Sequence, residues 1–193
     1  DGNPNASVLI VGEAPGEVED FEGSPFMGPA GQIFENFLSN SFGSSRDEVF
    51  VTNVVACRPT EDSRPDKNRK PDKSEIAACR HRLHRIIEIV DPYVVLLLGN
   101  TALKALTKDT RSISAIANDH RVPKVDVITD GQCMPVERTG FATFHPSYLL
   151  RHPQEVEGSP LHKSYLTWLK AFQVSDMYAE LHRGTPRPQR EGE

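Results

Sequence analysis

Four side chains of different chemistry stand out in this sequence: Glu13, Phe26, Asn53 and His145. A carboxylate can orient a water molecule or stabilise a developing positive charge, and a histidine can donate a hydrogen bond to an oxygen that gains negative charge. An aromatic ring offers a planar ligand a surface on which to stack. A side-chain amide presents a donor and an acceptor together, which matches the edge of a pyrimidine. Together these groups suit an enzyme that grips a nucleobase and breaks its bond to the sugar.

Each of these residues also has a purely structural interpretation. Glu13 could cap the turn after the first strand, and Phe26 could pack in the core. Asn53 could hydrogen-bond to its own turn, as Asn commonly does, and His145 could be a structural histidine. For any one residue alone we favour the structural interpretation, but their joint placement at strand ends favours the chemical one. Only one carboxylate stands out, unlike the paired carboxylates of glycoside hydrolysis.

The elements that must position these residues alternate between strands and helices. Such alternation predicts a three-layer α/β/α fold around a central, mostly parallel four-stranded sheet. Ligands of such sheets bind beyond the carboxyl ends of the strands, so we expect Glu13, Asn53 and His145 along one edge. The expected strands are 6–11, 49–56, 93–99 and 141–144, and the expected helices are 30–39, 75–90, 101–106 and 164–177.

The segment Cys57 to Ser74 is rich in proline and charge and is too long for an ordinary loop, which indicates that it is functional, disordered or both. We expect Ser74 to be the N-cap of the helix that follows. The chain has a net charge of -5, yet residues 64–85 hold eight Lys and Arg against three Asp and Glu. Such a patch attracts phosphate, although a solvated loop and helix face would look the same.

The remaining features concern organisation and environment. We expect one domain over residues 1–182, with a β-rich excursion at 108–140, and a disordered tail at 183–193. No apolar run approaches the length of a membrane span. Three cysteines are too few for a secreted disulfide framework and favour a reducing, cytoplasmic compartment. We expect a monomer.

Several segments at compatible spacing make the chain resemble the uracil-DNA glycosylase superfamily, and most of all its family 4, the iron–sulfur type. The resemblance runs from about Val8 to Arg151. The segments that carry it are GEAPG at 12–16, GSPFMGPAG at 23–31, TNVVACRP at 52–59, EIAAC at 75–79 and HPSYLLR at 145–151.

The resemblance implies hydrolysis of the N-glycosidic bond of deoxyuridine in DNA, after the base is flipped out of the stack, as a step of DNA repair. By this resemblance, Glu13 would handle the water or the cationic sugar, and His145 would stabilise the negative oxygen of departing uracil. Phe26 would stack on uracil and Asn53 would read its polar edge. Gly12 and Ala14 would also lie in the substrate site.

The same resemblance implies a set of contacts to uracil-containing DNA. Ser147 would contact a phosphate, Leu149 or Leu150 would fill the gap left in the stack, and Arg151 would lie near the backbone. The basic segment adds Arg69 and Lys70 as candidate DNA contacts.

A four-iron cluster held by four cysteines is also implied, and here the match is incomplete. Cys57 and Cys79 match two of the ligands, no cysteine precedes Val8, and Cys133 lies outside the pattern. The pair is either part of a 4Fe–4S site or two ordinary thiols. A related branch links covalently to DNA through a histidine in a basic insertion, but the segment 64–71 has no histidine.

Three interpretations of function stay open on the sequence. The first is an active uracil-DNA glycosylase. The second is a non-enzymatic module that keeps the fold and binds single-stranded DNA or a replication partner. The third is a glycosylase for another base, because the amide of Asn53 can rotate and pair with more than one base edge.

Overall fold

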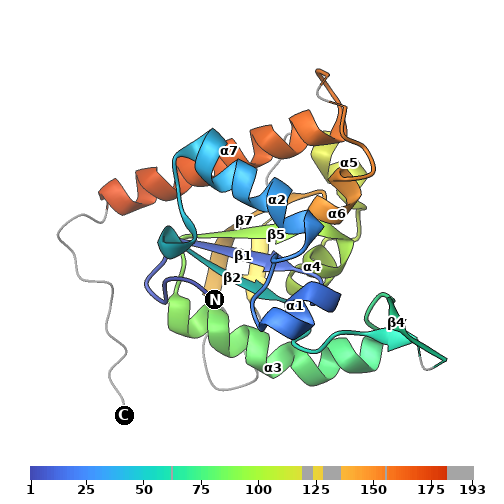
Figure 1. The fold of residues 1–193 in the computed structure, drawn as a ribbon. Helices are drawn as coiled ribbons and strands as arrows, with labels where there is room; N and C mark the ends of the chain where they lie inside the picture. Colours follow the sequence, from blue (N-terminus) through green and yellow to red (C-terminus); the bar gives the residue numbers. More distant parts are fainter. Residues whose placement is uncertain (62, 119–123, 128–135, 155, 182–193) are drawn as a thin grey trace, which may run out of the picture.

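The computed structural model describes residues 1–61, 63–118, 124–127, 136–154 and 156–181 (Figure 1). At its centre lies a five-stranded sheet in the order β2-β1-β5-β7-β6. Every residue of the two middle strands β1 and β5 is buried, as their continuous apolar sequences require when both faces of a sheet are covered. The strands are β1 Val8–Gly12, β2 Val49–Asn53, β5 Val94–Leu98, β6 Lys124–Val127 and β7 Val136–Thr143.

Four of these strands run parallel, which confirms the prediction of a mostly parallel four-stranded sheet. The fifth, β6, pairs antiparallel with β7 at the edge. It comes from the segment 108–140, which also contributes the helix α5 (Ile113–Asn118) and the first half of β7. The last strand is therefore longer than the predicted 141–144.

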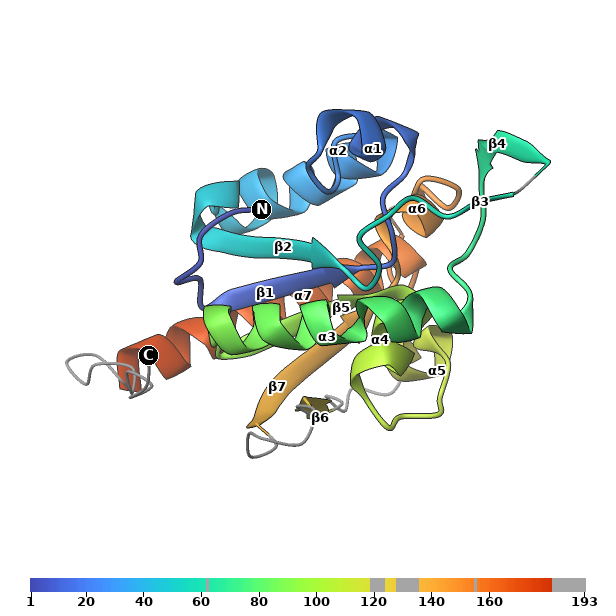
Figure 2. The same cartoon turned by 90° about the horizontal axis from the view of Figure 1, so that it is seen from below.

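Helices cover both faces of the sheet, as Figures 1 and 2 show: α2 and α7 lie on one face, and α3 and α4 lie on the other. The fully buried indole of Trp168 ties the first face together, because it contacts the rings of Phe34 and Phe37 at centroid distances of 5.7 and 5.1 Å. In the described part of the chain, no helix has the length and apolar character that crossing a membrane requires. These helices are α2 Pro29–Glu35, α3 Lys73–Val90, α4 Gly99–Leu106 and α7 Pro160–Leu181.

The start of α3 corrects one prediction. Asp72, not Ser74, is the N-cap: its Oδ1 accepts hydrogen bonds from the backbone N–H groups of Ser74 and Glu75 at 2.7 and 2.9 Å. Glu75 in return accepts from the Asp72 N–H at 2.8 Å, which completes a capping box. The carboxylate satisfies two helix-end donors, whereas the Ser74 hydroxyl itself donates to Asp72.

The long segment before α3 is neither a plain loop nor without structure. It forms an exposed antiparallel hairpin of β3 (Thr60–Glu61) and β4 (Arg64–Asn68). Two arginines at its base hold it in place: Arg58 Nε donates to the Asn68 side chain at 2.6 Å, and Arg69 Nε donates to the Thr60 carbonyl at 2.7 Å.

Short helices complete the fold, and the sequence analysis missed the first of them. α2 continues into a turn of π-helix, so the predicted helix 30–39 has two geometries. The tail from 183 and Cys133 lie outside the described residues, so the predictions made for them remain predictions. The short elements are α1 Glu17–Glu22, the π-helical turn Asn36–Ser41, the 3-10 turn Arg46–Glu48 and α6 Pro146–Leu149.

Candidate active site

The carboxyl edge of the sheet brings together the strand ends that the sequence singled out. Gly12 pairs with Asn53 between β1 and β2, and Leu98 pairs with Thr143 between β5 and β7. The chain therefore leaves four parallel strands at one edge, where Asn53 ends β2, Glu13 follows β1, and His145 follows β7 on the far side of β5. This placement confirms the prediction that these residues lie along one edge.

Gly12 allows two of the candidate groups to approach one another. A Cβ atom on this residue would lie 2.3 Å from Oδ1 of Asn53 and 2.8 Å from Cζ of Phe26. Both distances are far below an ordinary carbon contact, so no other residue fits without moving the amide or the ring. Residue 12 is a glycine because neighbouring groups approach it closely, and not because its φ angle is unusual.

The main chain around Asn53 is held by other residues. The Asn53 carbonyl accepts a hydrogen bond from Arg82 Nη2 at 2.5 Å, and Arg82 Nη1 donates to the Thr52 hydroxyl at 3.1 Å. The next amide, that of Val54, donates to the Gly12 carbonyl at 3.0 Å. The Asn53 side chain is 8% exposed, and among the described residues its amide has no hydrogen-bond partner. Its donor and acceptor are therefore free to bind a ligand, while the main chain that carries them is held in place.

Phe26 has an unusual backbone that its neighbours impose. Its φ angle is +57°, a left-handed conformation that is rare for a bulky residue. Its ring stacks on Phe34 with centroids 4.8 Å apart and planes 7° apart. A Cβ atom on Gly31 would lie 1.9 Å from the Phe26 carbonyl oxygen, so this glycine makes room for the turn. Strain of this kind persists where the surroundings over-determine it, often at functional sites.

Arg46 is the main stabilising group of that turn, and the sequence analysis missed it. Its Nη1 donates to the Pro25 carbonyl at 2.9 Å and its Nη2 donates to the Phe26 carbonyl at 2.8 Å. Its guanidinium also lies 5.0 Å from the centroid of the Phe34 ring. A single arginine far along the chain carries no local motif, so only the tertiary structure reveals this role.

His145 is held as a neutral imidazole with a defined tautomer. Its Nδ1 accepts a hydrogen bond from the Ser147 backbone N–H at 3.2 Å and lies 2.9 Å from the Ser147 hydroxyl. Burial lowers the pKa of His145 to about 4. Because Nδ1 is an acceptor, the single proton of the neutral ring is on Nε2, which can donate to a ligand. The ring also lies 5.6 Å from the Phe26 ring, centroid to centroid.

Glu13 is anchored through its side chain and its main chain. One carboxylate oxygen accepts a hydrogen bond from the Thr101 hydroxyl in the first turn of α4, a partner that the sequence analysis missed. The Glu13 carbonyl accepts from the Val55 N–H at 3.2 Å. Ala14, the other residue predicted near the substrate, is half-buried against the core. The carboxylate is thus oriented by one hydroxyl, with its second oxygen available.

Glu19 joins the two glycine-containing turns of the first loop. It accepts hydrogen bonds from the backbone N–H groups of Gly16 at 3.0 Å and Gly28 at 2.8 Å. The turn after β1 and the turn before α2 are therefore linked by one carboxylate. This linkage fixes the position of the loop that carries Phe26.

The residues predicted to contact DNA differ in exposure. Ser147 and Leu149 lie in α6, and Leu149 has no exposed surface, so the structure assigns its side chain to the core. This corrects the prediction that either leucine could fill a gap in the stack. Leu150 is 40% exposed and Arg151 is exposed, so both can reach a ligand.

The two predicted DNA contacts before α3 also differ. Arg69 is bound within the protein, because both of its terminal nitrogens donate to the Glu75 carboxylate at 2.8 Å. Lys70 is exposed and makes no ion pair among the described residues. Arg69 therefore braces the hairpin against α3, and of the two only Lys70 presents an uncommitted charge.

The cysteines do not form a complete cluster site in the described part of the chain. Cys57 is exposed and Cys79 is half-buried, and both are free thiols. Over the described residues, no group of three or more His, Cys, Asp and Glu side chains is placed to hold a metal ion. A four-iron cluster normally requires four ligands. The two described thiols alone do not fit such a cluster.

Comparison with known proteins places the chain. Residues 1–170 match the uracil DNA glycosylase superfamily. A type-4 uracil-DNA glycosylase of Thermotoga maritima is 39% identical over 156 residues, which cover 79% of this chain and 70% of that protein. One of Sulfurisphaera tokodaii is 36% identical over 154 residues, which cover 79% of this chain and 65% of that protein. One of Saccharolobus solfataricus is 42% identical over 108 residues, which cover 56% of this chain and 47% of that protein.

The chain thus spans less than two thirds of the Sulfurisphaera and Saccharolobus proteins. The family match over residues 1–170 nevertheless covers the sheet, the edge with Glu13, Asn53 and His145, and most of the helices. These comparisons confirm the resemblance that the sequence motifs indicated. The chain belongs to the uracil-DNA glycosylase superfamily.

Proposed function

We propose that this protein is a uracil-DNA glycosylase, which hydrolyses the N-glycosidic bond of deoxyuridine in DNA. One observation carries the proposal: a free side-chain amide at Asn53 and a neutral imidazole at His145 lie at the same sheet edge as the carboxylate of Glu13. The names of the relatives, type-4 uracil-DNA glycosylases, support the same activity.

In this proposal the flipped uracil is recognised by complementary groups. The Asn53 amide donates through Nδ2 to the uracil O4 and accepts through Oδ1 from the uracil N3–H. Gly12 keeps the amide and the Phe26 ring at their close separation.

Bond breaking then requires charge stabilisation on both sides of the bond. As the bond between the sugar C1′ and the uracil N1 breaks, its electrons move into the uracil ring and onto O2. The Nε2–H of His145 donates to that oxygen, which gains negative charge. The Glu13 carboxylate, oriented by Thr101, stabilises the positive sugar and positions the water whose oxygen bonds to C1′. The water loses a proton as its oxygen bonds to C1′, and the uracil anion takes up a proton from solvent, so the products are neutral uracil and an abasic sugar.

The experiment that tests the proposal is excision from a single-stranded oligonucleotide that carries one deoxyuridine. Alkaline cleavage at the abasic site gives the readout. We expect the parent chain to excise uracil and Glu13→Ala to be slower by about 100-fold or more, the usual effect of losing an acid–base group. Glu22→Ala is the control, because Glu22 is an exposed carboxylate on α1.

Two results would contradict the proposal. A folded chain that binds the oligonucleotide without releasing uracil would favour the non-enzymatic binding module. A Glu13→Ala variant as fast as the parent would remove the assigned role of the carboxylate.

A further inference from the structure

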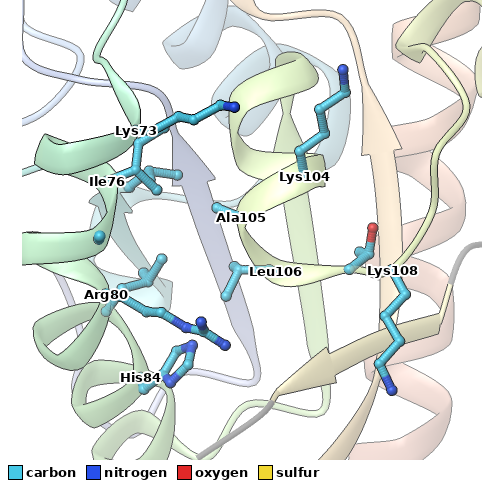
Figure 3. Close-up of a pocket in the computed structure, with 12 residues that line it drawn as sticks. Lys73, Ile76, Arg80, His84, Lys104, Ala105, Leu106 and Lys108 are labelled. Carbon is cyan, nitrogen blue, oxygen red and sulfur yellow. The ribbon is translucent and has the colours of Figure 1, made fainter.

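A basic groove lies between α3 and α4, outside the site described above. It encloses a cavity of about 300 Å³ whose floor is apolar and includes Ile76 and Leu106 (Figure 3). No Asp or Glu of the described residues lines it. The basic side chains that line the groove are Lys73, Arg80, His84, Lys104 and Lys108.

Three of the groove's cations, Lys73, Arg80 and Lys104, differ from most other basic residues nearby in making no ion pair with a described residue. Four of the eight Lys and Arg in residues 64–85 form ion pairs, and a fifth, Arg82, binds main-chain carbonyls of β2. Lys73 and Arg80, by contrast, make no ion pair among the described residues, and the same holds for Lys104. The ion pairs are Arg64 with Asp66, Lys67 with Glu61, Arg69 with Glu75 and Arg85 with Glu88.

Like charges gathered around a cavity whose described lining has no carboxylate raise the local positive potential and attract anions. The groove is therefore the place where the basic segment can act on a ligand. The paired cations of the hairpin are largely neutralised and contribute less to the local potential.

The groove lies next to chain segments that carry the candidate active site. Val54, which follows Asn53, is one of the residues that line it. Thr101, which holds Glu13, precedes Lys104 on α4 by three residues, a rise of about 4.5 Å along a helix. Helix α4 leaves β5 at the carboxyl edge, so Lys104 lies near that edge (Figure 3).

On the other wall of the groove, Lys73 is the first residue of α3. It extends toward α4 at the same end of the groove as Lys104, whereas Arg80 lies about 10 Å farther along its helix (Figure 3). The unpaired cations therefore follow the groove away from the edge instead of clustering at one point.

We propose that this groove binds the phosphates of the DNA strand that leaves the active site, so that it holds the nucleotides flanking the excised base. Lys73 and Lys104 contact the phosphate nearest the edge, and Arg80 contacts one farther along. The apolar floor faces the sugars and bases between them. This inference rests on the proposed function, since it takes the strand from the excision site.

The test measures how salt weakens the binding of a uracil-free single-stranded oligonucleotide, by fluorescence anisotropy. The variant is Arg80→Gln with Lys104→Gln, and the control is Arg85→Gln with Lys170→Gln. All four side chains are exposed, so both double variants should fold like the parent, which circular dichroism checks. Oligonucleotides of about 16 and about 4 nucleotides are compared, the range that one single-strand binding site covers.

For the long oligonucleotide we expect the slope of log K against log salt to become shallower by about 1.4 in the groove variant, because each lost phosphate contact removes about 0.7. The short oligonucleotide reaches only the phosphate nearest the edge, so it should lose only the Lys104 contact and its slope should become shallower by about 0.7. The control should keep the parent slope with both oligonucleotides. An unchanged slope in the groove variant, or an equal change in the control, would overturn the inference.

A second arm separates DNA phosphates from free phosphate ligands. Pyrophosphate is titrated against the parent and the groove variant. Tight pyrophosphate binding in the parent, together with an unchanged DNA slope in the variant, would assign the groove to a free ligand and overturn the inference. Because the oligonucleotide contains no uracil, the slope test is independent of excision: a chain that excises uracil but fails the slope test refutes the groove alone.

Discussion

The carboxyl edge of the sheet and the α3–α4 groove differ in how firmly their functional side chains are held by neighbouring residues. At the edge, neighbouring residues hold the groups that surround the ligand site: Arg82 holds the Asn53 main chain, Arg46 holds Phe26, and Thr101 holds Glu13. In the groove the charges of Arg80 and Lys104 have no ion-pair partner among the described residues. The edge is preorganised for one ligand shape, whereas the groove offers charge to any strand.

This difference predicts which property a substitution in each region should change. A preorganised site loses rate when a group moves by a fraction of an ångström. An electrostatic groove loses affinity in proportion to the charges removed and depends on salt. We therefore expect edge variants to change the excision rate and groove variants to change the salt dependence of binding. The predictions below test the edge half of this comparison.

The largest effect is expected from Gly12→Ala. The added methyl group would collide with the Asn53 amide and the Phe26 ring, so both must move, and excision should fall by about 100-fold or more. Gly158→Ala is the steric control: nothing lies within 4 Å of its added Cβ, so the only cost there is the backbone strain of its φ of +78°. Excision kinetics on single-stranded substrate measure the effect. A parent-like rate in Gly12→Ala would show that the edge is not tightly packed around the base.

His145→Gln should slow excision by roughly 100-fold, the usual cost of removing a donor to a developing oxyanion. In the parent chain the pKa of His145 is lowered to about 4 by burial, so the ring should stay neutral from pH 8 to pH 5. NMR of the ring carbons gives the titration directly. A titration midpoint near 6.5, the ordinary value, would contradict the buried, neutral imidazole.

The same shift predicts a stability change with a definite sign. Between pH 6.5 and about 4 the unfolded chain binds a proton at His145 that the folded chain does not. As the pH is lowered from 6.5 to about 4, the free energy of unfolding of the parent should therefore fall relative to that of His145→Gln, by an amount on the order of 3 kcal/mol. Denaturant unfolding of both chains at several pH values measures the difference. A constant difference across this range would count against the lowered pKa.

A smaller effect is expected from Arg46→Gln. The change removes the donors to the Pro25 and Phe26 carbonyls, so the strained turn should loosen and kcat/KM should fall roughly tenfold. Arg85→Gln removes an equal charge from an exposed position and serves as the control. A loss of stability with unchanged kcat/KM in the remaining folded protein would limit Arg46 to a structural role.

The smallest effect concerns the two leucines after His145. Leu150→Ala should slow excision a few-fold more on double-stranded than on single-stranded substrate, because a wedge matters only where a stack must be opened. Leu149→Ala should instead lower the free energy of unfolding by about 2–5 kcal/mol, as expected for a fully buried leucine. Equal rate losses of Leu150→Ala on both substrates would remove the wedge role.

The sequence predicted which residues lie at the carboxyl edge of the sheet, but not which residues hold them in position. Apolar strands alternating with helices place Glu13, Asn53 and His145 at one edge, because parallel strands carry their carboxyl ends together. The roles of Arg46 and Thr101 depend on contacts between residues far apart in the chain, which no local pattern records.

The basic segment shows the same limit. Its composition indicated a phosphate-attracting patch, but composition does not tell which charges are already paired. Arg69 is bound to Glu75, whereas Arg80 is unpaired among the described residues and faces α4. The predicted N-cap of α3 was wrong for a local reason. Asp72 and Ser74 are both good N-cap residues, and it is the Asp72 carboxylate that accepts from the backbone donors.

The measurement that tests the central claim most directly is the base preference of Asn53→Asp, taken as relative excision rates on otherwise identical single strands that carry uracil or cytosine. The account predicts a large loss of activity on uracil and a gain on cytosine relative to uracil, because a carboxylate cannot donate to the uracil O4 but accepts from the cytosine amino group. An unchanged preference for uracil would contradict the claim that the free amide at the sheet edge reads the base.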